Sequence, residues 1–173
     1  MRNIIKDRAI LANDWPLLRL SEEQTAESVA VPSGRVIVPL AVWLAQRPAL
    51  RARTDVGVWI ASSERAEALR DDVALLPLIA VDFPKFSDGR GYSIAYQLRA
   101  RLAYTGELRA IGDVLRDQLF YMQRVGFNAF DVRADRDVED ALKGLTDFSV
   151  PYQNSWDHKA PLFGRVQRTG AAA

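Results

Sequence analysis

The sequence predicts an α/β fold with a mainly parallel sheet, and two observations support this prediction. Along residues 35–145, strand-like apolar runs alternate with helical patterns in units of roughly 20 to 30 residues, as βαβ crossovers require. The strand-like runs are apolar almost throughout, which is typical of strands covered on both faces. About five such units are too few for a closed eight-stranded barrel. We therefore expect an open doubly wound sheet, or a partial barrel of the TIM type that a homodimer would complete.

The N-terminal residues 1–34 are expected to lie at the periphery of this sheet. The segment NIIKDRAILA reads as two short strands joined by a turn at residues 6–8, which predicts an N-terminal β-hairpin. Asp14 and Pro16 favour a further turn. The polar residues 21–34 then predict a surface connection.

Five strands are expected in the parallel part of the sheet. Each is a short run rich in Val, Ile, Leu or Phe, followed by turn-forming or helical residues. Glu107 and Arg109, in the fourth run, are expected to be surface charges. The runs are RVIV at 35–38, VGVWIA at 56–61, LPLIAVDF at 76–83, ELRAIG at 107–112 and FNAFDV at 127–132.

Helices are expected to alternate with these strands, over residues 39–47, 64–76, 92–104, 113–126 and 137–145. Ser62 and Ser63 offer an N-cap to the second helix, and Gly126 is a stop signal for the fourth. Residues 151–173 do not continue this alternation of strands and helices. We therefore expect a single domain of residues 1–150, followed by a poorly ordered C-terminal tail.

The composition excludes several classes of function. There is no cysteine among the 173 residues, which excludes disulfides, a catalytic thiol, thiolate-bound zinc and a cysteine-held iron–sulfur cluster. His158 is the only histidine, so neither a metal site nor a Ser–His–Asp triad is expected. A net charge of +1 is too small to favour nucleic acid or an anionic membrane as the partner.

The hydrophobic pattern predicts a cytoplasmic protein. The longest near-apolar run, VIVPLAVWLA, has about half the length that spans a bilayer. The N-terminal residues lack the apolar core of a signal peptide. Arginine accounts for 19 of the 23 basic side chains, and its planar guanidinium suits oxyanions such as phosphate and sulfate.

Aspartates lie at or just after the carboxyl ends of three of the predicted strands. In parallel α/β folds ligands bind at the carboxyl ends of the strands, which makes Asp82, Asp113 and Asp131 the candidate catalytic residues. Asp113 is better explained as the N-cap of the next helix. Asp131 either points into a site or forms an ion pair at the sheet edge.

The segment VDFPKFSDGRGYS, residues 81–93, predicts an anion-binding site. Two glycines would let backbone amides approach a ligand, the following helix presents its positive end, and basic side chains add mobile cations. The alternative is that Asp88 caps the helix and the glycines only turn the chain. The predicted anion-binding residues are Lys85, Asp88, Gly89, Arg90, Gly91, Ser93 and Arg116.

No nucleotide motif identifies a cofactor. GRGYSI is not the dinucleotide fingerprint, because Ile94 stands where the third glycine belongs, and it is not a P-loop. A cofactor such as NADPH or a flavin would therefore bind through a different loop.

Residues 76–130, together with VIVPLAVWL near the N-terminus, resemble a bacterial family of uncharacterised proteins described as probable oxidoreductases of sulfite reduction. Members of that family tend to be encoded beside assimilatory sulfite reductase genes. The resemblance implies a role in sulfite reduction, a small oxyanion such as sulfite or sulfate as the ligand, and sulfite reductase as the partner. It supplies no catalytic residues.

The resemblance leaves two roles open. Sulfite reduction uses siroheme and an iron–sulfur cluster, and a chain without cysteine cannot be the reducing subunit on its own. The first role is an oxidoreductase that borrows NADPH or a flavin. The second is a non-catalytic accessory protein that docks on sulfite reductase.

Overall fold

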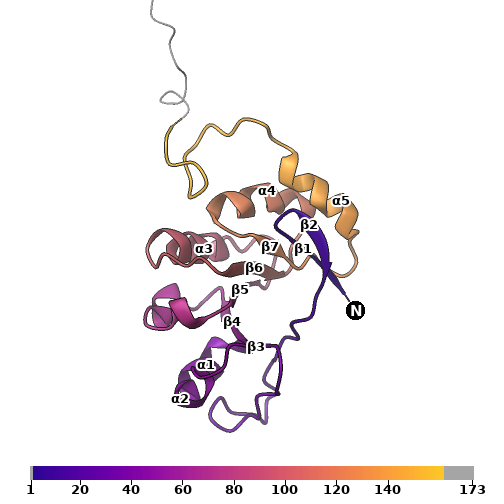
Figure 1. The fold of residues 1–173 in the computed structure, drawn as a ribbon. Helices are drawn as coiled ribbons and strands as arrows, with labels where there is room; N and C mark the ends of the chain where they lie inside the picture. The colour runs from indigo at the N-terminus through magenta and orange to yellow at the C-terminus, as the bar shows by residue number, and fades with distance from the viewer. Residues whose placement is uncertain (1, 162–173) are drawn as a thin grey trace, which may run out of the picture.

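The computed structural model describes residues 2–161, and its centre is a seven-stranded open sheet (Figure 1). The strands lie in the order β2-β1-β7-β6-β5-β4-β3. Strands β3 to β7 are parallel, whereas β1 is antiparallel to both β2 and β7. The predicted α/β class, mainly parallel sheet and N-terminal hairpin are therefore confirmed. The strands are β1 (Asn3–Lys6), β2 (Ala9–Ala12), β3 (Val36–Pro39), β4 (Val56–Ala61), β5 (Leu78–Phe83), β6 (Glu107–Gly112) and β7 (Ala129–Phe130).

The helices that connect the strands are short. Within residues 2–161, none of them is long and apolar enough to cross a bilayer. The α-helices are α1 (Leu40–Ala45), α2 (Arg47–Leu50), α3 (Arg90–Ala100), α4 (Arg116–Val125) and α5 (Val138–Lys143), and the 3-10 helices are η1 (Ala66–Leu69), η2 (Val73–Leu75) and η3 (Gly144–Thr146).

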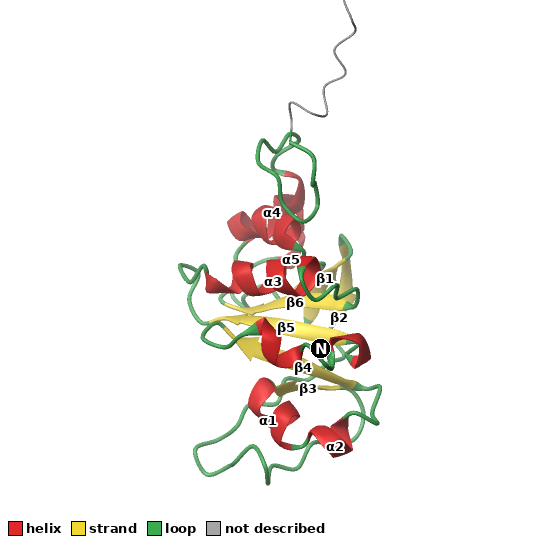
Figure 2. Ribbon diagram, turned by 90° about the vertical axis from the view of Figure 1, so that its left-hand side faces the viewer, coloured by secondary structure: helices red, strands yellow, loops and turns green. Residues whose placement is uncertain are grey.

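The parallel strands follow one another in the sheet in the same order as in the chain. Right-handed crossovers that always step in one direction place their helices on one face. In Figure 1, α1, α2 and α3 lie to the left of the sheet, and the segment from β2 to β3 runs along its right. Figure 2 shows α3 in front of the strands, with α1 and α2 below β3. The sheet lacks the reversal of strand order that defines a doubly wound sheet. The sheet is therefore open but not doubly wound, and it does not curl into the alternative partial barrel.

The two faces of the sheet are buried in different ways. Alternate strand residues, such as Val58 in β4 and Val81 in β5, pack with the helices in the main core. The side chains that point the other way form a smaller cluster, and we call this side the helix-free face. Its apolar residues are Ile37, Leu78, Ala80 and Ile111, with Trp15, Leu17 and Trp59 packed against them.

The hairpin turns at Asp7 and Arg8, whose φ angles are 48° and 65°. Consecutive residues with positive φ are typical of the tight turns whose twist suits a hairpin. Because β1 pairs with β7, the hairpin extends the sheet beyond its last parallel strand.

The prediction of a helix over residues 64–76 is wrong, because the segment forms only the 3-10 helices η1 and η2. The hydroxyl of Ser62, one of the two expected caps, donates instead to Asp88 at 2.7 Å. The carboxylate of Glu64 accepts the backbone N–H of Ala61 at 2.7 Å. The Ser62 hydroxyl is thus used elsewhere, and η1 begins without a side-chain cap.

Part of the expected tail contacts the rest of the molecule. Asp157 forms an ion pair with Arg124 at 3.4 Å, and the ring of Trp156 lies 5.3 Å from the guanidinium of Arg99. Poor order is predicted for residues 151–173, and residues 162–173 of that range lie outside the described residues.

Asp72 joins the segment after η1 to α1 and α2. Its side chain is fully buried and accepts a hydrogen bond from Nε1 of Trp43 at 2.9 Å. Arg47 and Arg51 approach the same carboxylate at 2.7 Å and 2.9 Å. A buried carboxylate needs such partners, because an unpaired charge in the protein interior is costly.

We expect Asp72→Ala to lower the free energy of unfolding by about 3 kcal/mol, because it leaves the Trp43 N–H unpaired and removes the charge that two arginines share. Urea unfolding followed by circular dichroism measures this change. The matched control is Asp71→Ala, since this neighbouring carboxylate is 77% exposed and 3.7 Å from Arg47, and should cost about 0.5 kcal/mol or less. Equal losses in the two variants would contradict the central role of Asp72.

Candidate functional site

In the predicted anion loop, Asp88 neutralises the charge of Arg90. Asp88 accepts hydrogen bonds from Nη2 of Arg90 and from Oγ of Ser62, both at 2.7 Å. The Arg90 guanidinium, followed by the Ser62 hydroxyl, holds the pKa of Asp88 well below its usual range. Asp88 also accepts the backbone N–H of Arg90 at 3.1 Å. The N-cap of α3 is Gly89, without a side-chain cap, so Asp88 is not the cap that the alternative predicts. Its carboxylate offsets the charge of Arg90.

The same loop presents Lys85 and Phe86 to solvent. Lys85 is exposed, and within residues 2–161 it takes part in no ion pair. Phe86 is 59% exposed, but its N–H donates to Asp113 at 2.9 Å and its carbonyl accepts from Gln118 at 2.8 Å. Asp113 is therefore not the N-cap of α4, a position that Leu115 occupies. The carboxylate of Asp113 holds the preceding loop instead.

Two other predicted anion-binding residues lie apart from this loop. Arg116 pairs with Asp140 and Asp147, each at 3.2 Å, and so joins α4 to the residues around α5. Ser93, on the first turn of α3, lines a groove with three tyrosines. Within the described part of the chain, neither residue shares a hydrogen bond with Asp88.

The two glycines of the loop differ in what surrounds them. A Cβ at Gly91 would lie 2.5 Å from the ring of Phe83, so this glycine allows α3 to approach β5 closely. A Cβ at Gly89 would have no atom within 4 Å. Gly91 is thus used for packing within the fold.

Two of the candidate catalytic aspartates lie on the helix-free face. Asp82, in β5, forms an ion pair with Arg19 at 3.1 Å. Asp131, directly after β7, forms one with Arg2 at 3.0 Å. Because Asp113 belongs to the loop above, the structure does not bring the three aspartates to one site.

Asp131 lines a cavity of about 460 Å³ on the helix-free face. The cavity lies over β3, β6 and the end of β7, and the residues that follow the hairpin close it from the other side. The lining residues that matter for its chemistry are Arg2, Asn13, Trp15, Arg109, Ile111 and Asp131.

A network of buried charges lies beside this cavity. Arg109 is only 2% exposed; its Nε donates to Glu107 at 2.7 Å and its Nη1 donates to Asn13 at 2.9 Å. Nζ of Lys6 lies 2.8 Å from the other oxygen of Glu107. The expectation that Glu107 and Arg109 are surface charges is therefore wrong, because the N-terminal residues cover this side of β6.

The charges around the cavity do not balance. Counting the lining residues and their ion-pair partners, four cations accompany three carboxylates: Arg2, Lys6, Arg35 and Arg109 against Asp14, Glu107 and Asp131. Burial raises the pKa of Asp131, and the opposing attraction of Arg2 and Arg109 is smaller. The site therefore combines a net positive charge with a carboxyl group that takes up a proton more readily than an exposed aspartate. No cluster of potential metal ligands occurs within residues 2–161.

Arg109 is not among the predicted site residues, although the sequence contains one signal that points to it. In ELRAIG the charged Glu107 and Arg109 alternate with Leu108 and Ala110. Side chains two positions apart in a strand share a face, so the two charges had to lie together. Nothing in the sequence indicates that Asn13 covers them.

Comparison with known proteins identifies the family. A family model described as "Bacterial protein of unknown function (DUF934)" matches residues 57–163. The chain belongs to the DUF934 family. The matched range includes Arg109 and Asp131, whereas Arg2 and Lys6 precede it. The comparisons with curated proteins and with solved structures found no match.

We expect Gly91→Ala to lower the free energy of unfolding by about 1–3 kcal/mol, because the new methyl group overlaps the ring of Phe83. Gly89→Ala is the matched control, since it adds the same group where no atom lies within 4 Å. Urea unfolding of both variants checks this difference. A Gly91→Ala variant as stable as Gly89→Ala would show that the ring moves aside freely.

The raised pKa of Asp131 makes stability depend on pH. The folded protein binds more protons than the unfolded chain between about 3.9, the pKa of an unfolded aspartate, and the raised pKa. Stability from the neutral carboxyl is thus present at low pH and lost as pH rises through this window. Asp131→Asn stays neutral, so we expect it to gain stability relative to the unmodified protein between about pH 4 and pH 7.

Urea unfolding at a series of pH values measures this gain. The control is Asp135→Asn, because Arg133 lowers the pKa of Asp135. The stability that the ionised Asp135 provides is lost as pH falls. Asp135→Asn should therefore show no gain in the free energy of unfolding, relative to the unmodified protein, toward neutral pH. A flat difference between Asp131→Asn and the unmodified protein would contradict the assigned pKa direction.

Proposed function

We propose that this protein binds a small sulfur oxyanion, sulfite or sulfate, in the cavity on the helix-free face, and acts as an accessory protein of sulfite reduction. The observation that supports binding is the excess of one positive charge, since Arg2, Lys6, Arg35 and Arg109 accompany Asp14, Glu107 and Asp131. A bound oxyanion would balance this excess.

Arg109 would orient the anion. Glu107 and Asn13 hold its guanidinium in place, and a guanidinium has five N–H donors, so donors remain for a ligand. Because Arg109 is almost fully buried, its charge acts through a medium of lower dielectric than water, which strengthens attraction. A guanidinium fixed in this way loses little conformational freedom when it binds an oxyanion.

This proposal moves the anion from the predicted loop to the helix-free face. In the loop, Asp88 already offsets the charge of Arg90, so Lys85 is the one predicted cation there without an ion pair within residues 2–161. The helix-free face instead combines several cations with a concave surface. The anion is therefore better accommodated there.

The accessory role follows from the chemistry of the chain and from its resemblance to proteins described in terms of sulfite reduction. An oxidoreductase without cysteine would need NADPH or a flavin to carry electrons. A protein that supplies an oxyanion to sulfite reductase needs only a binding site and a docking surface. We therefore favour docking on sulfite reductase over catalysis with a borrowed cofactor.

Isothermal titration calorimetry of the full chain with sulfite and with sulfate tests the site. Arg2→Ala should weaken binding about tenfold or more, because a hydrogen bond to a charged group contributes about 1.5–3 kcal/mol. Asp131→Asn removes a negative charge beside the anion and should strengthen binding at pH values where the carboxyl is ionised. Arg65→Ala, at an exposed arginine that does not line the cavity, should leave the affinity unchanged.

Two results would contradict this site. If Lys85→Ala or Arg90→Ala abolished binding and Arg2→Ala did not, the anion would belong to the predicted loop. If the unmodified protein bound neither anion, the binding proposal would be wrong. The pathway is tested by deleting the gene: rescue of growth by sulfide but not by sulfite supports it, and normal growth on sulfate contradicts it.

A further inference from the structure

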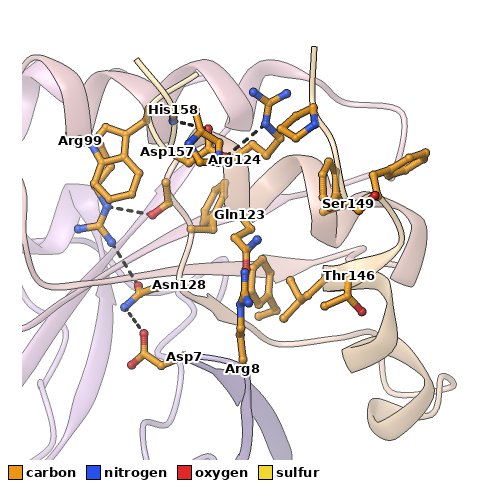
Figure 3. A pocket seen from close by; sticks show the side chains of 18 of the residues that line it. Asp7, Arg8, Arg99, Gln123, Arg124, Asn128, Thr146, Ser149, Asp157 and His158 are labelled. Atoms are coloured by element: carbon orange, nitrogen blue, oxygen red, sulfur yellow. Dashed lines mark hydrogen bonds and ion pairs between the residues drawn. The ribbon is translucent and has the colours of Figure 1, made fainter. Parts of the chain in front are cut away.

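A second cavity, of about 930 Å³, lies near the amino-terminal ends of the parallel strands (Figure 3). Its walls are the hairpin turn at Asp7 and Arg8, one side of α4, and parts of residues 145–158. It shares no lining residue with the cavity on the helix-free face. Its volume lies within the range typical of small-molecule sites.

Arg99 contributes a buried positive charge to this cavity. The residue is 7% exposed, and its guanidinium donates to the carbonyls of Gly126 at 2.9 Å, Tyr104 at 2.7 Å and Gly106 at 3.0 Å. Its fourth hydrogen bond is to the amide oxygen of Asn128 at 3.2 Å. All these partners are neutral, although buried arginines are usually paired with acids.

Arg8 adds a second cation with a neutral partner. It projects from the hairpin turn toward α4 (Figure 3), and its Nε donates to the amide oxygen of Gln123 at 3.1 Å. Within residues 2–161, neither Arg8 nor Arg99 takes part in an ion pair. Asp7 is the acid next to them, and one of its oxygens accepts from Asn128 at 3.1 Å.

The other charged groups of this cavity are matched. Arg124 pairs with Asp157 at 3.4 Å, and His158 lies 3.8 Å from the same carboxylate. Two arginines and one aspartate, namely Arg8, Arg99 and Asp7, then leave one positive charge without a counterion. An anionic group of a ligand would offset it.

Aromatic rings form another part of the wall. Phe148 is 65% exposed and its ring meets that of Phe120 edge to face, with centroids 5.0 Å apart. Trp156 is 38% exposed and packs over the guanidinium of Arg99 at 5.3 Å. Exposed rings beside a cavity offer flat apolar surface on which a planar ligand can stack.

We propose that this cavity binds a nucleoside monophosphate, with the phosphate beside Arg8 and Arg99 and the base against Phe148 and Trp156. A nucleotide uses both features at once, because its phosphate balances the cations and its base covers exposed aromatic surface. The side chains of Thr146 and Ser149, on the same segment (Figure 3), supply hydroxyls for the ribose. This inference goes beyond the proposed oxyanion site and does not depend on it.

Calorimetry of the full chain with adenosine 5′-monophosphate tests the proposal, with adenosine and inorganic phosphate as separate probes. We expect the nucleotide to bind more tightly than either fragment. Arg8→Gln and Phe148→Ala should each weaken its binding about tenfold, because they remove the phosphate contact and the stacking surface. Both side chains are exposed, so both variants should fold.

Arg65→Gln is the matched control and should leave nucleotide affinity unchanged. Arg2→Ala should also leave it unchanged, which separates this site from the oxyanion site. Equal affinity for the nucleotide and inorganic phosphate would overturn the proposal in favour of a simple anion site. The absence of nucleotide binding, or binding that Arg8→Gln and Phe148→Ala do not weaken, would also overturn it.

Discussion

The strand order is the constraint on which the rest of this structure depends. Because β3 to β7 follow one another in the sheet as they do in the chain, right-handed crossovers place the helices on one face. The other face still carries apolar side chains, such as Ile37 and Ile111, and these must be covered without helices. The N-terminal residues supply this cover. The hairpin extends the sheet beside β7, and the segment after it lays Trp15 and Leu17 against the exposed strands.

Ion pairs and a hydrogen bond hold these N-terminal residues against the parallel strands. Each of three contacts joins one of the first 13 residues to β6 or to the end of β7. A buried ion pair is tolerable only when its partners are complete, because the desolvation of each charge must be offset. The hairpin, the residues after it and the charged network should therefore form together. The contacts are Arg2 with Asp131, Lys6 with Glu107, and Asn13 with Arg109.

Charges elsewhere at the strand ends are mostly neutralised by close neighbours, as the pairs Asp88–Arg90 and Arg116–Asp140 show. Excess positive charge instead accompanies the two cavities, where arginines lie beside tryptophan or phenylalanine rings. The two cavities are closed by different segments of the chain. The first is closed by residues that cover the sheet, and the second by the hairpin turn, α4 and the segment that follows η3. The proposed ligands differ accordingly, one being a compact oxyanion and the other an anion with a planar ring.

The α/β class, the hairpin and the places of the parallel strands could be predicted from the amino-acid sequence, because these follow from the composition and period of short continuous runs. It also placed Asp82 and Asp131 at strand ends. It could not show that Glu107 and Arg109 are buried, that Ser62 serves Asp88 instead of a helix, or that Arg2 at the N-terminus pairs with Asp131. The tertiary structure alone decided these points, because each depends on a contact between residues far apart in the chain. Asn13 and Arg109, for example, are separated by 96 positions, and no local pattern records their meeting.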